Sequence, residues 1–229
     1  MIIADKIGQQ AGPSSRLAPS EQPVVFVIDD DASVRDAVTD LLRSVGLATQ
    51  SFEATQEFLH SKRPDAPGCI VLDIRLPGTS GLDFQRTLAE SSIQLPVIFI
   101  TGHGNISMSV RAIKSGAIEF LAKPFHEQDL LDAVQAGIER DRARRQQFRL
   151  VAGLQDRFSV LTAREREVLA LVITGRPNKQ IAAQLELSET TVKVHRSHIM
   201  RKMQARSLID LVRMFDRLSS DISRLARAS

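Results

Sequence analysis

The sequence contains one cysteine, no tryptophan, no tyrosine and no long apolar run among its 229 residues. A single cysteine, Cys69, excludes an intramolecular disulfide. The apolar stretches fall well short of the roughly 20 residues that a membrane-spanning helix needs. The N-terminus also lacks the basic flank, apolar segment and cleavage site of a signal peptide. We therefore expect a cytoplasmic protein, long enough for one large domain or two modest ones.

The two halves of the chain are each poor in charge of one sign. Residues 1–137 hold 11 lysines and arginines against 17 aspartates and glutamates, a net charge of −6. Residues 138–229 hold 19 basic against 10 acidic residues, a net charge of +9. This asymmetry favours an acidic part that binds a metal or a partner, joined to a part that meets a polyanion. Two solvated surfaces that merely differ in charge are the alternative.

Apolar runs alternate with helical patterns over about 120 residues. Helical spacing relates apolar residues such as Val34, Val38 and Leu41. The alternation predicts an α/β fold of (βα)5 order, a doubly wound parallel sheet with helices on both faces. The predicted strands lie at 24–28, 47–52, 69–72, 97–101 and 119–123.

Polar side chains stand at the ends of four predicted strands. They are Asp29 and Asp30 after the first, Asp73 after the third, Thr101 at the end of the fourth and Lys123 at the end of the fifth. Ligands gather at this edge of open α/β sheets. Carboxylates there suit Mg²⁺, and a hydroxyl and an ammonium suit the oxygens of a phosphoryl group. A carboxylate at such a site can also act as a nucleophile and form an aspartyl-phosphate.

These five residues, in this order, resemble the receiver domain of two-component response regulators, and the resemblance covers about residues 23–140. It implies a CheY-like sheet in which Asp73 accepts a phosphoryl group from the phosphohistidine of a sensor histidine kinase. It further implies that Lys123 and Thr101 hold the phosphoryl oxygens. The implied Mg²⁺ site consists of Asp30 as a direct ligand, Asp29 acting through water, Asp73, and the backbone carbonyl of Arg75. Phe120 occupies the family's aromatic switch position, and the Lys123-Pro124 bond is expected to be cis.

An alternative remains for the first acidic cluster. Asp29 and Asp31 resemble the Asp-x-Asp nucleophile motif of haloacid-dehalogenase-type phosphatases. Those enzymes also need a late acidic pair, which the basic half of the chain does not offer. We therefore expect that the protein is not an enzyme. Taken singly, Asp73 could also be a turn or helix-capping residue, and Phe120 could be an ordinary core residue.

The part of the chain from residue 161 shows only helical periodicity and predicts a compact bundle of about four helices. Thr162 and Glu165 have the spacing of a capping box. Gly175 is expected to end that helix, and Asn178 and Ser188 to cap the next two. Before this bundle, the fifth helix of the receiver is expected to begin near residue 127 and to continue as a charged helical linker.

The helix that follows Ser188 has two contrasting faces. Val192, Ile199 and Met203 share one face, which we expect to join the core. The other face carries Thr190, Lys193, Val194, Ser197 and Arg201. A cationic face with one small apolar residue suits the major groove of DNA, where an apolar side chain can contact a thymine methyl group. Two helices joined by a short turn, with the second one exposed, predict a helix-turn-helix motif.

Two stretches resemble the LuxR-type DNA-binding domain: Leu-Thr-x-Arg-Glu-x-Glu-Val-Leu at 161–169 and Ser-Glu-Thr-Thr-Val-Lys-Val-His at 188–195. The resemblance implies that Lys193, Val194 and Ser197 face DNA bases. It implies that Lys179, Thr191 and Arg196 contact backbone phosphates, while Glu165 and Glu167 belong to the scaffold. The alternative is a helical bundle with a solvated basic face.

A receiver followed by a LuxR-type domain resembles the FixJ/NarL class of response regulators, and residues 101–104 are most similar to the FixJ side. Residues 1–22 and 63–81 resemble the NodW group of nodulation regulators. This resemblance implies a DNA-binding transcriptional regulator, typically an activator, that is phosphorylated on Asp73, dimerises, binds promoter DNA and engages RNA polymerase. A regulator that binds DNA independently of phosphorylation, with the receiver serving only for dimerisation, is the alternative.

The domain boundaries follow from the same patterns. They predict a disordered tail at 1–22, a receiver at 23–138, a helical linker at 139–158, a helix-turn-helix domain at 159–218 and a C-terminal tail at 219–229.

Overall fold

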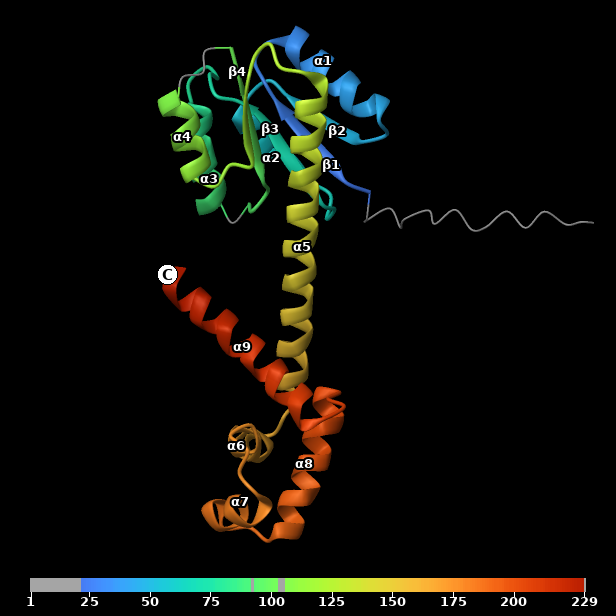
Figure 1. Cartoon of the computed structure of the whole chain (residues 1–229), viewed down its shortest axis with the longest axis vertical. Coiled ribbons are helices and arrows are strands. Elements are labelled where there is room, and N and C mark those ends of the chain that lie inside the picture. The colour runs from blue at the N-terminus through green and yellow to red at the C-terminus, as the bar shows by residue number, and fades with distance from the viewer. Residues whose placement is uncertain (1–21, 92, 103–105, 229) are drawn as a thin grey trace, which may run out of the picture. The chain divides into compact units, whose positions relative to one another are not determined.

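The computed structural model describes residues 22–91, 93–102 and 106–228 (Figure 1). The predicted tail at 1–22 falls outside the described residues except for residue 22, and so do residues 103 and 104. The chain forms two compact units, divided between Ala143 and Arg144. No helix in the described part of the chain is both long and apolar enough to cross a membrane.

The first unit is built on a parallel sheet of five strands. They are β1 (Val24–Ile28), β2 (Ala48–Phe52), β3 (Gly68–Asp73), β4 (Val97–Thr101) and β5 (Glu119–Ala122). Their order in the sheet is β2-β1-β3-β4-β5, so the direction of winding reverses between β1 and β3. This order is that of the doubly wound, CheY-like sheet, and the predicted fold class is confirmed. No predicted strand end differs from the observed one by more than one residue.

Helices cover both faces of this sheet. They are α1 (Ala32–Ser44), α2 (Thr55–His60), α3 (Gly81–Glu90), α4 (Ile106–Lys114) and α5 (Glu127–Ser159). Residues of α2, α3 and α4 join one hydrophobic cluster with side chains from one face of the strands. Residues of α1 and α5 join a second cluster with side chains from the other face. The continuous apolar runs of β1, β3 and β4 therefore arise because these strands are buried on both sides.

Phenylalanine rings fill much of the first cluster. Phe58 is fully buried, and its ring makes edge-to-face contacts with Phe26, Phe52 and Phe84 at centroid distances of 5.3, 5.6 and 5.9 Å. Each such pair contributes about 0.5–1.5 kcal/mol beyond the area that it buries. Phe99 and Leu88 belong to the same cluster, which holds α2 and α3 against the sheet.

Helix α5 is held against the start of strand β3. Asp141 is fully buried, and its Oδ2 accepts a hydrogen bond of 3.1 Å from the Gly68 backbone N–H. Gly137 lies so close to this strand that an added Cβ would stand 2.9 Å from the Cβ of Cys69. The Cys69 thiol is buried there, and burial, with a smaller effect from the Asp141 carboxylate, raises its pKa. Contact with the sheet thus continues through residue 141.

The second unit is entirely helical. It contains the last turns of α5 together with α6 (Ala163–Val172), α7 (Asn178–Leu185), α8 (Glu189–Met203) and α9 (Leu208–Ala228). One hydrophobic cluster joins all of these helices, and it includes Leu154, Val168, Ile181, Val192 and Leu211. The predicted small helical bundle is therefore observed. Residues 219–228 continue α9 as a helix.

Helix caps in this unit agree with the sequence at two of three positions. Thr162 and Glu165 form the predicted capping box, and the Ser188 hydroxyl accepts a hydrogen bond from the Thr191 N–H. The prediction for Asn178 is wrong, because Pro177 occupies the cap position and Asn178 is the first residue of α7. Helix α6 ends at Val172, before Gly175, whose φ of +79° fits the turn that follows.

Candidate functional site

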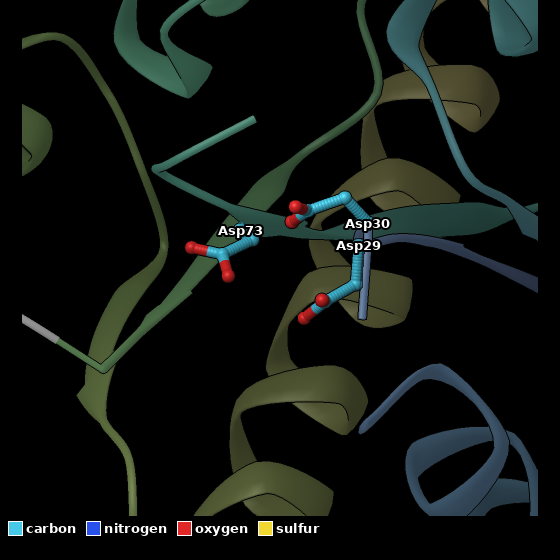
Figure 2. A group of neighbouring side chains, drawn as sticks. All are labelled: Asp29, Asp30 and Asp73. Carbon is cyan, nitrogen blue, oxygen red and sulfur yellow. The ribbon is translucent and has the colours of Figure 1, made fainter. Parts of the chain in front are cut away.

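Three carboxylates meet at the carboxyl edge of the sheet (Figure 2). Asp29 and Asp30 follow β1, and Asp73 is the last residue of β3, the strand that pairs with β1. One carboxylate oxygen of each residue lies within 4.8 Å of those of the other two. Asp29 and Asp73 are buried, whereas Asp30 is exposed. The parallel register therefore brings together side chains that are 44 positions apart in the sequence.

Lys123 completes this cluster from the end of β5. Its Nζ donates to Oδ2 of Asp29 at 2.7 Å and to Oδ2 of Asp73 at 2.9 Å. The lysine side chain retains 19% exposure. Lys123 is followed by a cis peptide bond to Pro124, as the resemblance implied.

The charges of this cluster alter one another's protonation. Burial raises the pKa of Asp29, although the hydrogen bonds from Lys123 and from the Asp31 N–H act to lower it. Burial acts to lower the pKa of Lys123, but the hydrogen bonds and charges of Asp29 and Asp73 outweigh it, and the pKa is raised. The lysine therefore stays charged and donates hydrogen bonds to both carboxylates.

The backbone near Asp73 is fixed by close contacts. The Arg75 N–H donates to Oδ1 of Asp73 at 3.0 Å, and Arg75 forms an isolated antiparallel bridge with Ser80. An added Cβ at Gly81 would lie 2.6 Å from the Asp73 carbonyl oxygen, so only glycine permits this approach of α3. Sequence analysis missed Gly81, although its place after Pro77 and Gly78 is a usable signal for a tight turn.

The remaining predicted residues of this site lie on the neighbouring strands. Thr101 ends β4 and is fully buried, and its carbonyl accepts from the Lys123 N–H at 2.8 Å. Phe120 lies on β5, paired in register with Phe99, and is partly buried against the first cluster. Thr101 therefore contacts the backbone of Lys123 from the neighbouring strand, and Phe120 lies on the strand that leads to Lys123.

The donor set at this edge fits a hard divalent cation. It offers carboxylate oxygens from three residues, one of them exposed, and Mg²⁺ in proteins needs only one or two carboxylates beside water. Asp31 is separate from this set, since its Oδ1 accepts from the Ser33 N–H at 2.9 Å and caps α1. That capping role argues against a pair of catalytic groups formed by Asp29 and Asp31.

Arg35 is a further residue of this site, and no sequence pattern indicated it. Its Nη1 donates to the Asp29 carbonyl oxygen at 2.7 Å and so fixes the backbone between β1 and α1. The arginine is six residues after Asp29, in the first turn and a half of α1. An arginine six residues after a strand does not by itself predict this contact, because the path of the loop between β1 and α1 determines which atoms its side chain can contact.

A second group of predicted residues lies on α7 and α8 of the helical unit. Val192, Ile199 and Met203 are buried, as their spacing predicts. Lys193 and Ser197 are exposed, and Val194 keeps 48% of its surface exposed. Lys179 at the start of α7 is also exposed. Helix α8 therefore presents cations and one apolar side chain to solvent.

Two of the residues predicted to contact phosphates form hydrogen bonds within the helical unit. The Thr191 hydroxyl lies 2.8 Å from that of Ser188 at the cap of α8. Arg196 Nη1 donates to Oδ1 of Asn178 at 3.1 Å and joins α8 to the start of α7. Asn178 thus holds the two helices of the motif together, a role that sequence analysis did not assign to it.

Glu165, on α6, is hydrogen-bonded to the last turn of α8. Its carboxylate accepts from Lys202 Nζ at 2.7 Å and from the Thr162 N–H at 2.8 Å, and the side chain is buried. Burial acts to raise the pKa of Glu165, but the hydrogen bonds from Lys202 and Thr162 outweigh it and lower the pKa to about 2. Glu165 is thus part of the scaffold and is turned away from solvent.

Comparisons with known proteins match both units. Residues 25–135 match the response regulator receiver domain, and residues 159–215 match the family of bacterial regulatory proteins of luxR type. Nodulation protein W of Bradyrhizobium diazoefficiens is 53% identical over 207 residues, which cover 90% of this chain and 91% of that protein. The response regulator protein TodT of Pseudomonas putida is 45% identical over 87% of this chain and 88% of its own length.

Solved structures agree with these relatives. The response regulator StyR shares 49% identity with a TM-score of 0.79, over 86% of this chain and 99% of that one. Full-length FixJ from B. japonicum shares 33% identity with a TM-score of 0.52, over 87% of this chain and 98% of that one. The similarity of this chain to each of these proteins therefore extends over nearly the full length of that protein.

Proposed function

Because the chain belongs to the two-component response regulators that join a receiver to a LuxR-type DNA-binding domain, we propose that phosphorylation of Asp73 controls its binding to promoter DNA. The observation that carries this proposal is the position of Lys123, whose ammonium contacts both Asp29 and Asp73. A lysine held between two carboxylates can transfer its hydrogen bonds to a phosphoryl group that arrives on one of them.

The proposed acceptor is a carboxylate oxygen of Asp73. This oxygen attacks the phosphorus of a phosphohistidine, the P–N bond breaks, and the imidazole leaves. Asp73 retains 8% exposure at the edge of the sheet, so a donor can reach it from one side. The Arg75 N–H holds the other carboxylate oxygen, which fixes the orientation of the group. Positioning and charge compensation are the main requirements of phosphoryl transfer.

A bound Mg²⁺ would supply positive charge against the phosphoryl oxygens. Asp30 and Asp73 would hold it directly, Asp29 through water, and the backbone carbonyl of Arg75 would complete the protein ligands. The exposure of Asp30 and the proximity of the three carboxylates support this assignment. Lys123 and the Thr101 hydroxyl would hold the remaining phosphoryl oxygens.

Phosphorylation would be transmitted through Thr101 and Phe120. The proposed movement of Thr101 toward the phosphoryl group makes room for Phe120 to turn inward from β5. The register of β4 and β5 supports this link, since Thr101 pairs with Ala122, two residues beyond Phe120. The change would remodel the surface of α4 and β5 so that two chains dimerise and bind a two-fold operator.

In the proposed DNA complex, Lys193, Val194 and Ser197 face bases in the major groove, and Lys179, Thr191 and Arg196 lie near backbone phosphates. The exposure of Lys179, Lys193, Val194 and Ser197 supports this arrangement. We further propose that the protein acts in the cytoplasm, where its DNA lies. There it would activate transcription by engaging RNA polymerase, and it would have no enzymatic turnover of its own.

The test compares the full chain with Asp73→Asn in the presence of a small phosphodonor, acetyl phosphate, and Mg²⁺. We expect the unaltered protein to gain the mass of one phosphoryl group, to dimerise and to bind promoter DNA more tightly. Asp73→Asn should show none of these changes, because an amide does not attack phosphorus. Mass spectrometry, light scattering and a DNA-binding assay measure the three outcomes.

Asp40→Asn is a matched control, because Asp40 is an exposed carboxylate on α1. This variant should respond to the phosphodonor as the unaltered protein does. If Asp73→Asn still dimerised or tightened on DNA in response to the phosphodonor, the phosphorylation mechanism would be wrong. If the unaltered protein and Asp73→Asn instead both dimerised and bound promoter DNA equally well without the phosphodonor, the receiver would serve only as a dimerisation module.

A further inference from the structure

A cavity lies between the last turns of α5 and the first half of α9, wholly within the helical unit. Its volume is about 300 Å³. Residues at 149, 150, 153, 154 and 157 line it from α5, and residues at 210, 213, 214 and 217 line it from α9. Each set has helical spacing and forms one stripe along its helix. The cavity is thus a groove between two facing stripes.

Four arginines line this groove. Arg149 and Arg157 lie on α5, and Arg213 and Arg217 lie on α9. The two on α5 are eight residues apart, which separates their Cα atoms by about 12 Å along the helix. The two on α9 are four residues apart and share one face. Arginines therefore line the groove from both helices, an arrangement that suits an anion with several oxygen atoms.

The arginines of the groove have no ion-pair partner among the residues that the structure describes. Within the described part of the chain, Arg149, Arg213 and Arg217 form no ion pair, and Arg157 donates only to the Met203 carbonyl oxygen at 3.4 Å. The one carboxylate in the groove, Asp210, accepts from the Arg206 N–H at 3.0 Å. Like charges held together in this way repel one another, and an anion would relieve the repulsion.

Apolar side chains also line the groove, which has room for a side group beside Gly153. Leu150, Leu154 and Met214 line it, and Leu150 is 48% exposed although it is a large apolar residue. Gly153 lies between the leucines, and a Cβ added there would meet no atom within 4 Å. The cavity thus combines several donors of positive charge with three apolar side chains.

This groove is distinct from the residues proposed to face DNA bases. Arg157 contacts the carbonyl of Met203, the last residue of α8, whereas Lys193 lies ten residues earlier in that helix. Ten residues of helix span about 15 Å.

We propose that this groove binds a phosphorylated small molecule of the nucleoside diphosphate class. Four guanidinium groups and one carboxylate give the groove a net charge of about +3, which matches the charge of a diphosphate monoester. A volume of about 300 Å³ lies at the low end for ligand sites and restricts the ligand to this size. The phosphoryl oxygens contact the arginines, and the ring system rests on Leu150, Leu154 and Met214.

The test uses the full chain, ADP and inorganic pyrophosphate, measured by isothermal titration calorimetry with EDTA present so that no divalent ion occupies the receiver. ADP should bind with one site per chain, and more tightly than pyrophosphate because its ring system contacts the apolar side chains of the groove. The double variant Arg149→Gln/Arg213→Gln should weaken ADP binding by more than roughly tenfold. Gly153→Leu should abolish binding while leaving the helix intact, because its side chain enters the groove.

Arg140→Gln is the control, since it removes an exposed charge from the same helix outside the groove. It should leave ADP affinity unchanged. Circular dichroism and thermal melting verify that each variant is folded. The proposal is wrong if neither probe binds, if pyrophosphate binds as tightly as ADP, or if Gly153→Leu leaves binding intact. It is also wrong if the double variant loses affinity for promoter DNA without any binding of ADP, since the arginines would then contact DNA phosphates.

Discussion

The carboxyl edge of the receiver sheet and the exposed face of α8 use charge in opposite ways. At the sheet edge, Asp29 and Asp73 are buried and share the ammonium of Lys123. On α8, Lys193 and Arg201 are exposed, beside a half-exposed Val194. Buried charges must be compensated within the protein, whereas exposed cations remain available to a partner. The first site can therefore respond to a small change of charge, and the second can be altered without loss of the fold.

Removing the shared cation should have the largest effect on stability. Lys123→Met leaves two buried carboxylates facing each other, and we expect it to lower the free energy of unfolding of the receiver by about 3 kcal/mol without Mg²⁺. The raised pKa of Lys123 means that its contribution is fully present below its ordinary pKa and is lost only at strongly alkaline pH. Urea denaturation at neutral pH measures the change.

Lys62→Met is the matched control, because Lys62 is exposed. It should change the free energy of unfolding by less than about 0.5 kcal/mol. Added Mg²⁺ should restore part of the stability of Lys123→Met, since the cation replaces the lost charge. Equal stability of the two variants would show that the carboxylates do not depend on Lys123.

Glu165 is an exception to this contrast between buried charges in the receiver and exposed charges in the helical unit, because it is a buried carboxylate in the helical unit. Glu165→Gln should lower the free energy of unfolding of the helical unit by about 2 kcal/mol at pH 7, as the charged hydrogen bond to Lys202 is weakened. The folded pKa of Glu165, about 2, lies below its ordinary value of 4.5. Its stabilisation is therefore present above pH 4.5 and is lost as the pH falls toward 2.

Thermal melts of the unaltered protein and of Glu165→Gln between pH 7 and pH 2 check this expectation. The difference between the two should shrink as the pH falls. A difference for Glu165→Gln that persists unchanged at pH 2 would contradict the role of its charge.

Asp29 should behave in the opposite way, because burial raises its pKa in the folded protein. Protonation of Asp29 at acidic pH removes the unfavourable free energy of burying its charge.

Lys193→Ala should have the smallest effect on stability and still impair function. We expect a change of less than about 0.5 kcal/mol in the free energy of unfolding, because the side chain is exposed. Affinity for specific promoter DNA should fall roughly tenfold or more. Arg206→Ala removes an exposed cation just before α9 and should leave specific affinity nearly unchanged. Unaltered DNA affinity of Lys193→Ala would contradict the assignment of the recognition face.

The sequence predicted most of the fold because its patterns are local and periodic. The apolar runs of β1, β3 and β4 mark strands buried on both faces, and Val192, Ile199 and Met203 mark the buried side of α8. The five polar residues at the strand ends were predictable together because parallel strands share one carboxyl edge.

Other features depend on contacts that one sequence does not reveal. Asn178 has the composition of a helix cap but serves Arg196, because Pro177 already occupies the cap position. Arg35 reaches the backbone of Asp29 only because of the path between β1 and α1. The arginines of α5 and α9 are 56 or more positions apart, and only the packing of these helices brings them to one groove.

The hydrogen bond from Gly68 to Asp141 matters for anyone who wishes to exchange receivers between regulators. Strand β3 carries Asp73 at one end, and at its other end it is tied to a carboxylate from within the predicted linker. A chimaera joined at residue 138 would separate Asp141 from the strand with which it packs. One joined after Ala143, where the two units divide, would keep that carboxylate with its own sheet. Moving the junction by five residues thus decides whether a transplanted receiver keeps the hydrogen bond between Asp141 and the start of β3.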